Sequence, residues 1–533
     1  MSIVRRAWDE AQYLRQCVKA GVLTVESPRR IARMAAGVRR FGLIGGGLSV
    51  AAERFGDRAA LIDELGSVSF AELDGDTNAL ANAWRARGLR AGDGVAILIR
   101  NHRGFHRAVF AAAKCGARII LLNTDFAGPQ IREVAEREGT DLLVHDDEYT
   151  ELLGDLVPRF GRYRAWMEAP GADTLDALIA ASPRDAPPKP TVPPRIILLT
   201  SGTTGTPKGA PRPEPRSLAP LGMLLERAPF RAGEVTVCAA PMFHTLGFTH
   251  AVLAVTFGST LVVRRRFDPA ATLAGIAEHR ASALIVVPIM LRRLLDLGDE
   301  ARARLDLSCL RVIVVAGSAL GADLCVRATT AFGPVVYNVY GSTEVAYASI
   351  ATPDDLAVAP GCVGRPVRGA VVRIVDDRGI PQPTGLTGRI FVGNAVQAEG
   401  YTGGGGKEML DGLMSSGDVG HFDAAGRLFV DGRDDEMIVS GGENVFPAEV
   451  EELLAQHDSI LEAAALGIPD DYHGQRLRAF VVLRPGASLT EQDVREYVRA
   501  HLARFKVPRD VVFLDRLPRN TTGKVLKRVL LEP

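Results

Sequence analysis

The residues with the clearest chemical potential form one loop, 198–210, which reads L-L-T-S-G-T-T-G-T-P-K-G-A. Hydroxyl groups, glycine N–H groups that no Cβ shields, and a lysine are the donors that a chain of phosphates requires. The candidate ligands are Thr200, Ser201, Gly202, Thr203, Thr204, Gly205, Thr206, Lys208 and Gly209. The apolar run 196–199 leads directly into the loop, so the sequence predicts a strand followed by a phosphate-binding loop.

Two other interpretations of this loop compete. A Walker A loop needs a lysine that follows a glycine and precedes Ser or Thr, whereas Lys208 precedes Gly209 and Ala210. The spacing therefore excludes that motif. A surface turn rich in Gly, Ser, Thr and Pro remains open for the loop taken alone.

Composition bounds the class of protein. A chain of 533 residues with 47% hydrophobic and 24% charged residues fits a globular enzyme of several domains. Basic and acidic residues both number 63, so no global charge favours nucleic acid as a partner. The six cysteines are scattered singly, which predicts reduced core residues. The sequence shows neither a bilayer-spanning apolar run nor a signal peptide, so we expect a cytoplasmic location.

The first 45 residues differ from the rest of the chain. They hold nine arginines and lysines against three acidic residues, and Trp8, Ala11, Leu14 and Val18 recur at helical spacing. This pattern predicts an amphipathic basic helix. Peripheral contact with an anionic membrane surface is one interpretation. A helix packed on the main body with solvated arginines is the commoner arrangement, and both stay open.

The elements that must position the loop alternate between helix and strand. A helical pattern at 70–87 lies among apolar runs such as 95–99 and 118–122, which predicts α/β layers. After a proline-rich connector, 183–194, strand-like runs follow at 260–263, 283–287, 311–316 and 335–339. The last two end in Gly317-Ser318-Ala319 and in Tyr340-Gly341-Ser342-Thr343-Glu344. Loops of this kind are where open α/β sheets bind ligands.

The pattern changes toward the C-terminus. Short β-like runs at 371–375 and 388–392 predict a small β-rich subdomain, and a helix begins at Pro447. We therefore predict an α/β protein with a large N-terminal region of stacked sheets and a small mobile C-terminal α+β domain. The predicted ranges are 1–47 for a basic extension, 48–434 for the large region and 435–533 for the small domain. The glycine run 403–406 is expected to be a flexible tip.

Several motifs now occur together in one order. They are the 200–209 loop, Pro241-Met242-Phe243-His244, 340–344, Ser416-Gly417-Asp418, Gly432-Arg433-Asp434-Asp435, Ser440-Gly441-Gly442-Glu443-Asn444, and P-R-N-T-T-G-K-V-L-K at 518–527. From about residue 50 onward the chain resembles the adenylate-forming (AMP-binding) superfamily of acyl-CoA synthetases, peptide-synthetase adenylation domains and luciferases. The resemblance implies that a carboxylate attacks the α-phosphate of ATP to give acyl-AMP and pyrophosphate. A thiol then attacks the acyl-AMP.

The resemblance also implies roles for single residues. Glu344 would bind Mg²⁺, Thr343 would approach the α-phosphate, and Lys524 would stabilise the charge that develops there. Tyr340 would stack on adenine, Asn338 would bond its edge, and Asp418 and Arg433 would reach the ribose. The opposite wall of the nucleotide site would come from Gly317, Ser318 and Ala319, and Gly341 belongs to the same loop as Tyr340.

The second step implies further roles. Asp435 matches the hinge about which the small domain rotates, bringing Gly441 and Gly442 to the pantetheine channel. His244 would line the carboxylate end of the acyl pocket rather than act as a general base. Its alternative is a structural hydrogen-bonding role.

We expect ATP, Mg²⁺ and coenzyme A to be used, with a small-molecule carboxylic acid as substrate. The closest branch by resemblance is that of medium- and long-chain fatty acyl-CoA synthetases, with the apolar stretch 246–255 as weak support. A fatty acyl-AMP ligase that serves a carrier protein is the first alternative. A non-catalytic nucleotide- or acyl-sensing protein is the second. The sequence carries no signal for oligomeric state.

Overall fold

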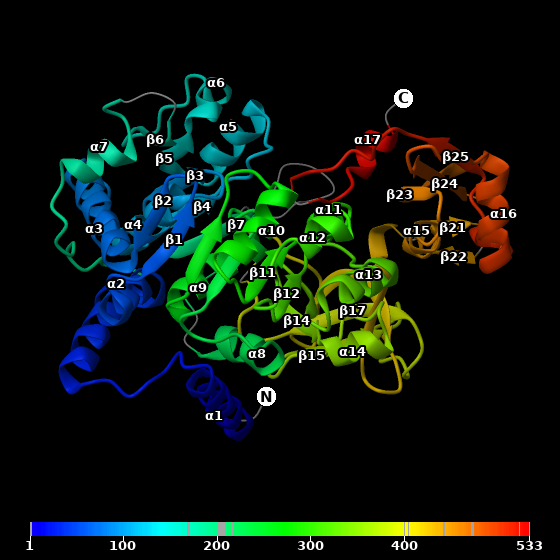
Figure 1. Ribbon diagram of the computed structural model, residues 1–533, viewed down its shortest axis with the longest axis horizontal. Coiled ribbons are helices and arrows are strands. Elements are labelled where there is room, and N and C mark those ends of the chain that lie inside the picture. Colours follow the sequence, from blue (N-terminus) through cyan, green and yellow to red (C-terminus); the bar gives the residue numbers. More distant parts are fainter. Residues whose placement is uncertain are drawn as a thin grey trace.

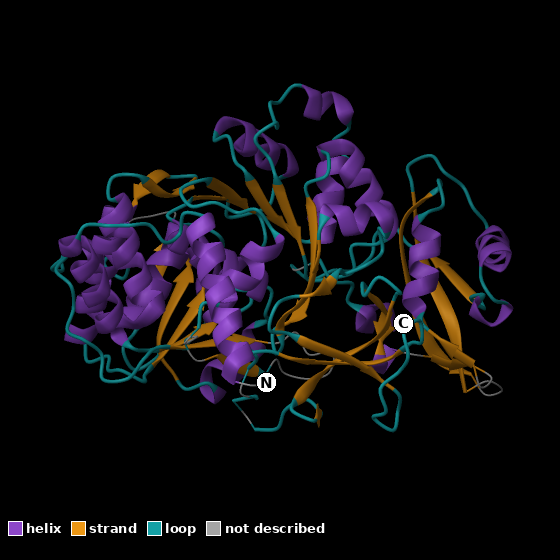
Figure 2. Cartoon of the chain, turned by 90° about the horizontal axis from the view of Figure 1, so that it is seen from below, coloured by secondary structure: helices purple, strands orange, loops and turns teal. Residues whose placement is uncertain are grey.

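The computed structural model describes residues 3–167, 171–199, 208–212, 214, 217–398, 400–402, 404–436, 438–440, 443–470, 474–521 and 523–531. A large body carries the chain up to about residue 433, and a smaller body, orange to red in Figure 1, lies beside it (Figures 1 and 2). This arrangement confirms the predicted α/β class with its small C-terminal α+β unit.

Two largely parallel sheets build the large body. In the described residues, the six-stranded sheet runs β6-β5-β3-β4-β7-β8 and the nine-stranded sheet runs β15-β14-β13-β12-β11-β9-β10-β1-β2. The strands of the first are β3 (Gly94–Leu98), β4 (Arg118–Leu121), β5 (Thr140–Asp146), β6 (Arg162–Trp166), β7 (Arg195–Leu199) and β8 (Gly209–Arg212). Those of the second are β1 (Ala59–Asp63), β2 (Gly66–Ser69), β9 (Val235–Cys238), β10 (Thr260–Val263), β11 (Ala283–Val286), β12 (Val312–Val315), β13 (Val336–Ser342), β14 (Ala346–Ala351) and β15 (Arg365–Pro366).

Helices fill the space between these sheets and cover their outer faces. They are α3 (Phe70–Ala86), α4 (Arg103–Cys115), α5 (Gly128–Arg137), α6 (Thr150–Leu153), α7 (Leu175–Ala180), α8 (Ala219–Arg227), α9 (Thr245–Phe257), α10 (Pro269–Glu278), α11 (Pro288–Leu295), α12 (Asp299–Ala303), α13 (Ala322–Phe332) and α14 (Pro353–Val358). Helix α4 contacts β3 and β4 of one sheet and β1 of the other, so the two sheets share one core. Strands buried on both faces, such as β12 (V-I-V-V), are typical of such layers.

The β-rich segment forms a third, antiparallel sheet. Its strands are β16 (Val371–Val375), β17 (Gly388–Gly393), β18 (Met409–Leu410), β19 (Leu413–Phe422) and β20 (Leu428–Arg433). The pairing of β19 with β20 places Asp418 opposite Arg433. Two residues from separate sequence motifs are therefore cross-strand neighbours.

The C-terminal unit has its own sheet and core. Its elements are β21 (Ile438–Ser440), β22 (Glu443–Val445), α15 (Pro447–Ala455), β23 (Ile460–Asp470), β24 (Gly474–Leu483), α16 (Glu491–His501), β25 (Asp510–Phe513) and α17 (Lys527–Leu531). The helix predicted from Pro447 is confirmed. A separate apolar cluster that includes Val450, Leu454 and Val498 lies within this unit.

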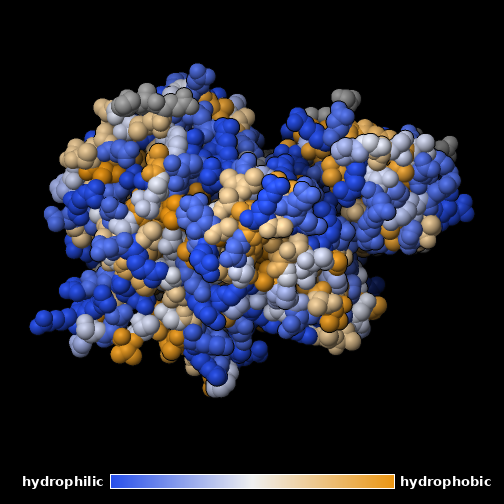
Figure 3. Space-filling model, viewed as in Figure 1, coloured by the Kyte–Doolittle hydropathy of each residue, from blue (hydrophilic) through white to orange (hydrophobic). Residues whose placement is uncertain are grey.

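The N-terminal segment forms two helices, α1 (Ile3–Lys19) and α2 (Pro28–Phe55). Helix α1 packs on α8, in agreement with the interpretation of a helix packed on the main body. The buried face of α1 carries Asp9, Tyr13 and Cys17 and does not include its apolar stripe. The stripe faces outward, and its exposed fractions are 80% for Val4, 61% for Trp8, 48% for Leu14 and 57% for Val18. Around α1, α2 and their connection, apolar and hydrophilic surface alternate at the lower left of Figure 3.

Two further expectations concern membranes and cysteines. Over the described residues, no helix has the length and apolar character to cross a bilayer. All six cysteines are free thiols, and five of them are buried, as predicted.

Candidate active site

The predicted site loops meet at one edge of the nine-stranded sheet. Residues 317–319 follow β12, and 340–344 form the end of β13 and the turn after it. Both line a cavity of about 2320 Å³ that also contains His244, Asp418 and Lys524. Because β12 and β13 are parallel neighbours, their carboxyl ends lie side by side.

Glu344 lies in a polar recess of this cavity and is 8% exposed. Ser342 Oγ donates to its Oε2 at 2.8 Å and Tyr401 OH donates to its Oε1 at 2.9 Å. Burial opposes ionisation of Glu344, but the charge of Lys407 and these hydrogen bonds outweigh it and lower its pKa. The carboxylate is therefore ionised at neutral pH.

An ionised oxygen ligand of this kind fits Mg²⁺. Among the described residues no cluster of three or more His, Cys, Asp or Glu side chains forms a cage. Magnesium commonly binds through one or two carboxylates together with substrate phosphates and water, and Glu344 in a cavity beside Lys208 provides that kind of place.

Tyr340, Asp418 and Arg433 form a chain of contacts between two sheets. Tyr340 OH donates to Asp418 Oδ2 at 2.6 Å, and Arg433 Nη1 donates to Asp418 Oδ1 at 3.1 Å. Burial and the Asp418 charge raise the pKa of Tyr340 well above its usual value, so its hydroxyl stays protonated and donates. Asn338 is buried nearby, and its Nδ2 donates to Cys362 O at 3.1 Å.

The loop that carries Thr343 is held from two sides. Thr343 Oγ1 lies 3.1 Å from Thr245 Oγ1 at the start of α9, and Thr343 O accepts from Arg212 Nη2 at 2.5 Å. At Gly341 an added Cβ would lie 1.7 Å from Ala346 O, so the tight β13–β14 turn requires glycine there. These contacts fix a hydroxyl next to Glu344.

Lys524 reaches the site from the C-terminal unit. Burial and the neighbouring Arg433 lower its pKa, while the carboxylates of Asp418 and Glu344 act in the opposite direction. Its turn is anchored on the large body, because Thr521 N donates to Asp125 Oδ2 at 2.6 Å. The structure thus brings Lys524 together with Asp418 and Glu344.

His244 lies at the residue before α9 and faces the same cavity. Burial, and secondarily the charge of Lys524, lower its pKa to about 4. The imidazole is therefore neutral at neutral pH.

Part of the predicted site lies outside the described residues. This applies to residues 200–207 of the phosphate loop, to Gly441 and Gly442, and to the side chain of Asp435, whose backbone lies in a 3₁₀ turn at Asp434–Glu436. Strand β7 ends at Leu199, as the apolar run 196–199 predicted, and β8 begins at Gly209. Lys208 Nζ lies 5.3 Å from the centre of the Tyr401 ring.

Sequence reasoning missed three contributors to the site. Tyr401 and Lys407 flank the glycine run that was interpreted as a flexible tip, yet Tyr401 bonds Glu344 and Lys407 Nζ donates to Ser416 O at 2.5 Å. Arg212, four residues beyond Lys208, supports the Thr343 loop. The signal in the sequence was the pair of functional side chains, Tyr401 and Lys407, on either side of the glycine run, because a flexible tip does not need them.

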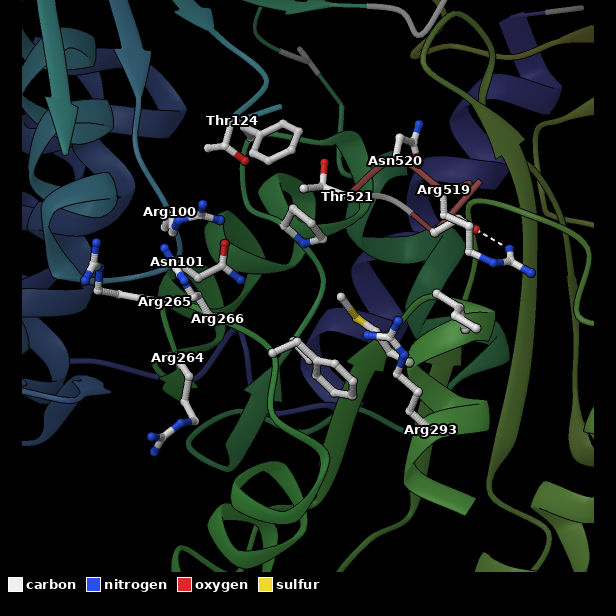
Figure 4. Close-up of a pocket in the computed structure, with 17 residues that line it drawn as sticks. Arg100, Asn101, Thr124, Arg264, Arg265, Arg266, Arg293, Arg519, Asn520 and Thr521 are labelled. Atoms are coloured by element: carbon white, nitrogen blue, oxygen red, sulfur yellow. Dashed lines mark hydrogen bonds between the residues drawn. The ribbon is translucent and has the colours of Figure 1, made fainter. Parts of the chain in front are cut away.

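A second, smaller pocket of about 260 Å³ lies between the large body and the turn that bears Lys524. Figure 4 shows Arg100, Arg265 and Arg266 gathered on one side, with Arg519, Asn520 and Thr521 on the other. Glu148 pairs with Arg100, Arg265 and Arg266, whereas Arg264 and Arg293 are exposed and make no ion pair in the described part of the chain. The pocket is therefore a net basic recess beside Phe243.

Comparison with known proteins decides the family. The model of the AMP-binding enzyme matches residues 48–402, and that of the AMP-binding enzyme C-terminal domain matches residues 449–524. The chain belongs to the AMP-binding enzyme family. It is an ATP-dependent acid–thiol ligase that forms an acyl-AMP and then an acyl-CoA, and it uses ATP, Mg²⁺ and coenzyme A.

Relatives and solved structures support this membership. The 3-[(3aS,4S,7aS)-7a-methyl-1,5-dioxo-octahydro-1H-inden-4-yl]propanoyl:CoA ligase of Mycobacterium tuberculosis is 34% identical, over 89% of this chain and 96% of its own. The indoleacetate–CoA ligase of Aromatoleum aromaticum is 33% identical, over 86% and 92% respectively. ATP-bound MatB from Rhodopseudomonas palustris aligns with a TM-score of 0.80 at 28% identity, over 91% of this chain and 98% of that one.

Proposed function

We propose that this acid–thiol ligase activates a medium- or long-chain fatty acid. The observation that carries the proposal is the apolar lining beyond His244, where α8 and α9 face the cavity. The lining residues include Leu218, Leu221, Leu246, Phe248, Val252 and Leu253. Such a wall binds alkyl groups through burial of apolar surface, at about 0.8 kcal/mol per CH₂.

We propose the following division of work within the site. Lys524 and Thr343 stabilise charge on the α-phosphate while the carboxylate attacks it, and Lys208 with the 200–207 loop receives the departing pyrophosphate. Glu344 would hold Mg²⁺, which would neutralise charge on the phosphates. Tyr340, Asn338 and the 317–319 backbone hold adenine, and Asp418 with Arg433 holds the ribose.

For the second step we propose a rotation of the C-terminal unit about Asp435. Lys524 would leave the cavity, and Gly441 and Gly442 would approach the thiol path. The basic recess with Arg264 and Arg293, which Phe243 also lines, offers charge to the phosphates of coenzyme A.

A panel of acids tests the substrate. We expect AMP and acyl-CoA formation with ATP, Mg²⁺ and CoA to have a higher kcat/KM for dodecanoate and palmitate than for indoleacetate or ferulate. The ring acids are the sharp comparison, because relatives are named for indoleacetate and ferulate. A preference for ring acids would overturn the fatty-acid assignment.

A carrier protein as the preferred acyl acceptor, ahead of CoA, is the second candidate. A relative 30% identical to this chain is named as the fatty acid–[acyl-carrier-protein] ligase ScoC of Streptomyces coeruleorubidus. Fatty acyl-AMP that is consumed faster by a phosphopantetheinylated carrier protein than by CoA would favour this candidate.

We further propose peripheral contact with an anionic membrane through residues 1–45. The outward stripe of α1 bears Trp8, and both acids of this helix face the body: Asp9 lies 3.7 Å from Arg368, and Glu10 accepts from Leu218 N at 3.2 Å. Apolar anchors surrounded by outward basic residues suit an interfacial helix.

Co-sedimentation with vesicles tests this contact. The protein should sediment with vesicles of phosphatidylglycerol and phosphatidylcholine, and Trp8→Asp should lower the bound fraction, whereas Val358→Asp, at another exposed site, should not. Equal sedimentation of both variants would contradict the contact.

A further inference from the structure

The apolar side of the large cavity does not end at α9 but extends to the N-terminal helix α2. The α2 residues that line it are Met34, Val38, Leu43, Ile44, Gly47 and Val50. Most of them precede residue 48, where the match to the family model begins. The N-terminal segment therefore contributes to the binding cavity from outside the region that defines the family.

Helices α2 and α9 face each other across this part of the cavity. On α9 the lining residues Leu246, Thr249, Leu253 and Thr256 recur at helical spacing, so they form one stripe. This stripe is about 15 Å long at a rise of 1.5 Å per residue. The two helices contact each other, and a Cβ on Gly258 after α9 would collide with the Phe55 ring at the end of α2.

A polar anchor fixes α2 in this position. The helix kinks at Gly42, where φ is 73°, and the kink releases the N–H groups of Leu43 and Ile44. Glu214 accepts both, at 3.0 Å and 2.9 Å. Since Glu214 lies just beyond β8, the α2 wall is attached to the strand that leaves the phosphate loop.

The charged side chains on this wall are already engaged. Besides Glu214, Arg54 lines the cavity, and its side chain is only 8% exposed. Its guanidinium donates to Val22 O at 2.6 Å and to Thr24 Oγ1 at 2.9 Å, and it pairs with Glu26. Neither charge is free to bind a second polar end of a substrate, so the wall favours an apolar chain.

We propose that α2 is the outer wall of the acyl channel and that the channel takes acids whose extended apolar chain reaches Gly47 and Val50. This inference rests on the proposed fatty-acid function and adds the element that sets chain length. Acids too short to reach α2 are held only by α8 and the first turns of α9.

Gly47→Leu is the test variant, because a Cβ at Gly47 meets nothing within 4 Å and the added side chain would enter open space. Helix propensity favours leucine over glycine, so we expect the variant to melt no lower than the wild type. Ala36→Leu, at an exposed position of the same helix, is the matched control.

We expect Gly47→Leu to lower kcat/KM for palmitate by about tenfold or more, a typical effect of altered fit in an apolar pocket. The value for butyrate should stay within about twofold, and Ala36→Leu should change neither acid. Equal loss on both acids, or no loss on palmitate, would overturn the inference.

A binding measurement separates this inference from the proposed function. Calorimetric titration of the wild type and Gly47→Leu with dodecanoate reports channel occupancy without turnover. Wild-type binding that is lost in Gly47→Leu supports the channel even if ring acids prove to be the better substrates. Undiminished binding to Gly47→Leu, or no binding to the wild type, overturns the channel even if fatty acids are turned over.

Discussion

At the scale of single residues, the site brings the carboxylate of Glu344 and the ammonium group of Lys524 into one cavity. Glu344 is kept ionised by donors and by Lys407, and the pKa of Lys524 is lowered by burial beside Arg433. The carboxylates of Asp418 and Glu344 offset only part of this effect. In the proposed mechanism the phosphates of ATP would add negative charge beside Lys524, where charge develops during adenylation.

Lys524→Ala tests this placement. We expect acid-dependent pyrophosphate release to fall by about 10²–10³-fold, the typical cost of removing one donor to a developing charge. Thioester formation from preformed acyl-AMP and CoA should persist, because the proposed rotation takes Lys524 out of the cavity before the thiol displaces AMP. Lys189→Ala, at an exposed loop position, should leave both steps unchanged. Unaltered pyrophosphate release in Lys524→Ala would contradict the assigned role.

The pH dependence tests His244. Its pKa of about 4 lies below the ordinary value because burial disfavours the charged form, so the ring gains a proton only as the pH falls toward 4. Between about pH 5.5 and 8, profiles of kcat/KM for wild type and His244→Asn should therefore have the same shape, even if their levels differ. A limb near 6.5 in the wild type that disappears in the variant would mean that the imidazole titrates during turnover.

At the scale of elements, much of the architecture could be predicted from apolar runs. Strands β10, β11 and β12 lie within the ranges that the sequence suggested, because buried parallel strands leave continuous apolar runs. The orientation of α1 could not be predicted. Its amphipathic pattern defines an apolar stripe, but Tyr13 fixes which face packs, through a hydrogen bond to Arg368 O 355 residues away.

The kink of α2 yields a prediction about stability. Glu214→Ala would remove the acceptor of two N–H groups, and leaving such groups unsatisfied costs about 1–3 kcal/mol. We expect the free energy of unfolding in urea to fall by an amount in this range, and Glu214→Gln to retain part of it. Glu300→Ala, at an exposed helix position, is the control. A stability equal to that of the control would show that water replaces Glu214 at the kink.

At the scale of the whole molecule, the site is complete only because two bodies meet. Motif order in the sequence predicted that Lys524 would join Glu344 and Asp418, but it could not predict the contacts that hold the two bodies in this arrangement. Those contacts join residues without a motif, such as Arg292 Nη1 to Leu461 O at 2.9 Å. The roles of Tyr401 and Lys407 could not be predicted for the same reason, because only the folded chain shows that their segment lies against Glu344.

Asp125→Ala tests whether these contacts select the adenylating arrangement. Asp125 is exposed and accepts from Thr521 N, three residues before Lys524, so its loss weakens the docking of the small unit while sparing the cavity itself. A loss of about 1 kcal/mol would lower the equilibrium constant for docking about fivefold. We expect acid-dependent pyrophosphate release to fall by up to that factor, while thioester formation from preformed acyl-AMP is unchanged or faster.

Asp515→Ala, an exposed acid elsewhere on the small unit, should affect neither half-reaction of this comparison. The rates of the two half-reactions distinguish the causes. Damage to the shared cavity lowers both rates, whereas a shift away from the docked arrangement lowers only the rate of pyrophosphate release. Equal loss in both half-reactions of Asp125→Ala would therefore contradict a role in docking. A selective loss of the first would indicate that one surface carboxylate helps to decide which of the two chemical steps the molecule is poised to perform.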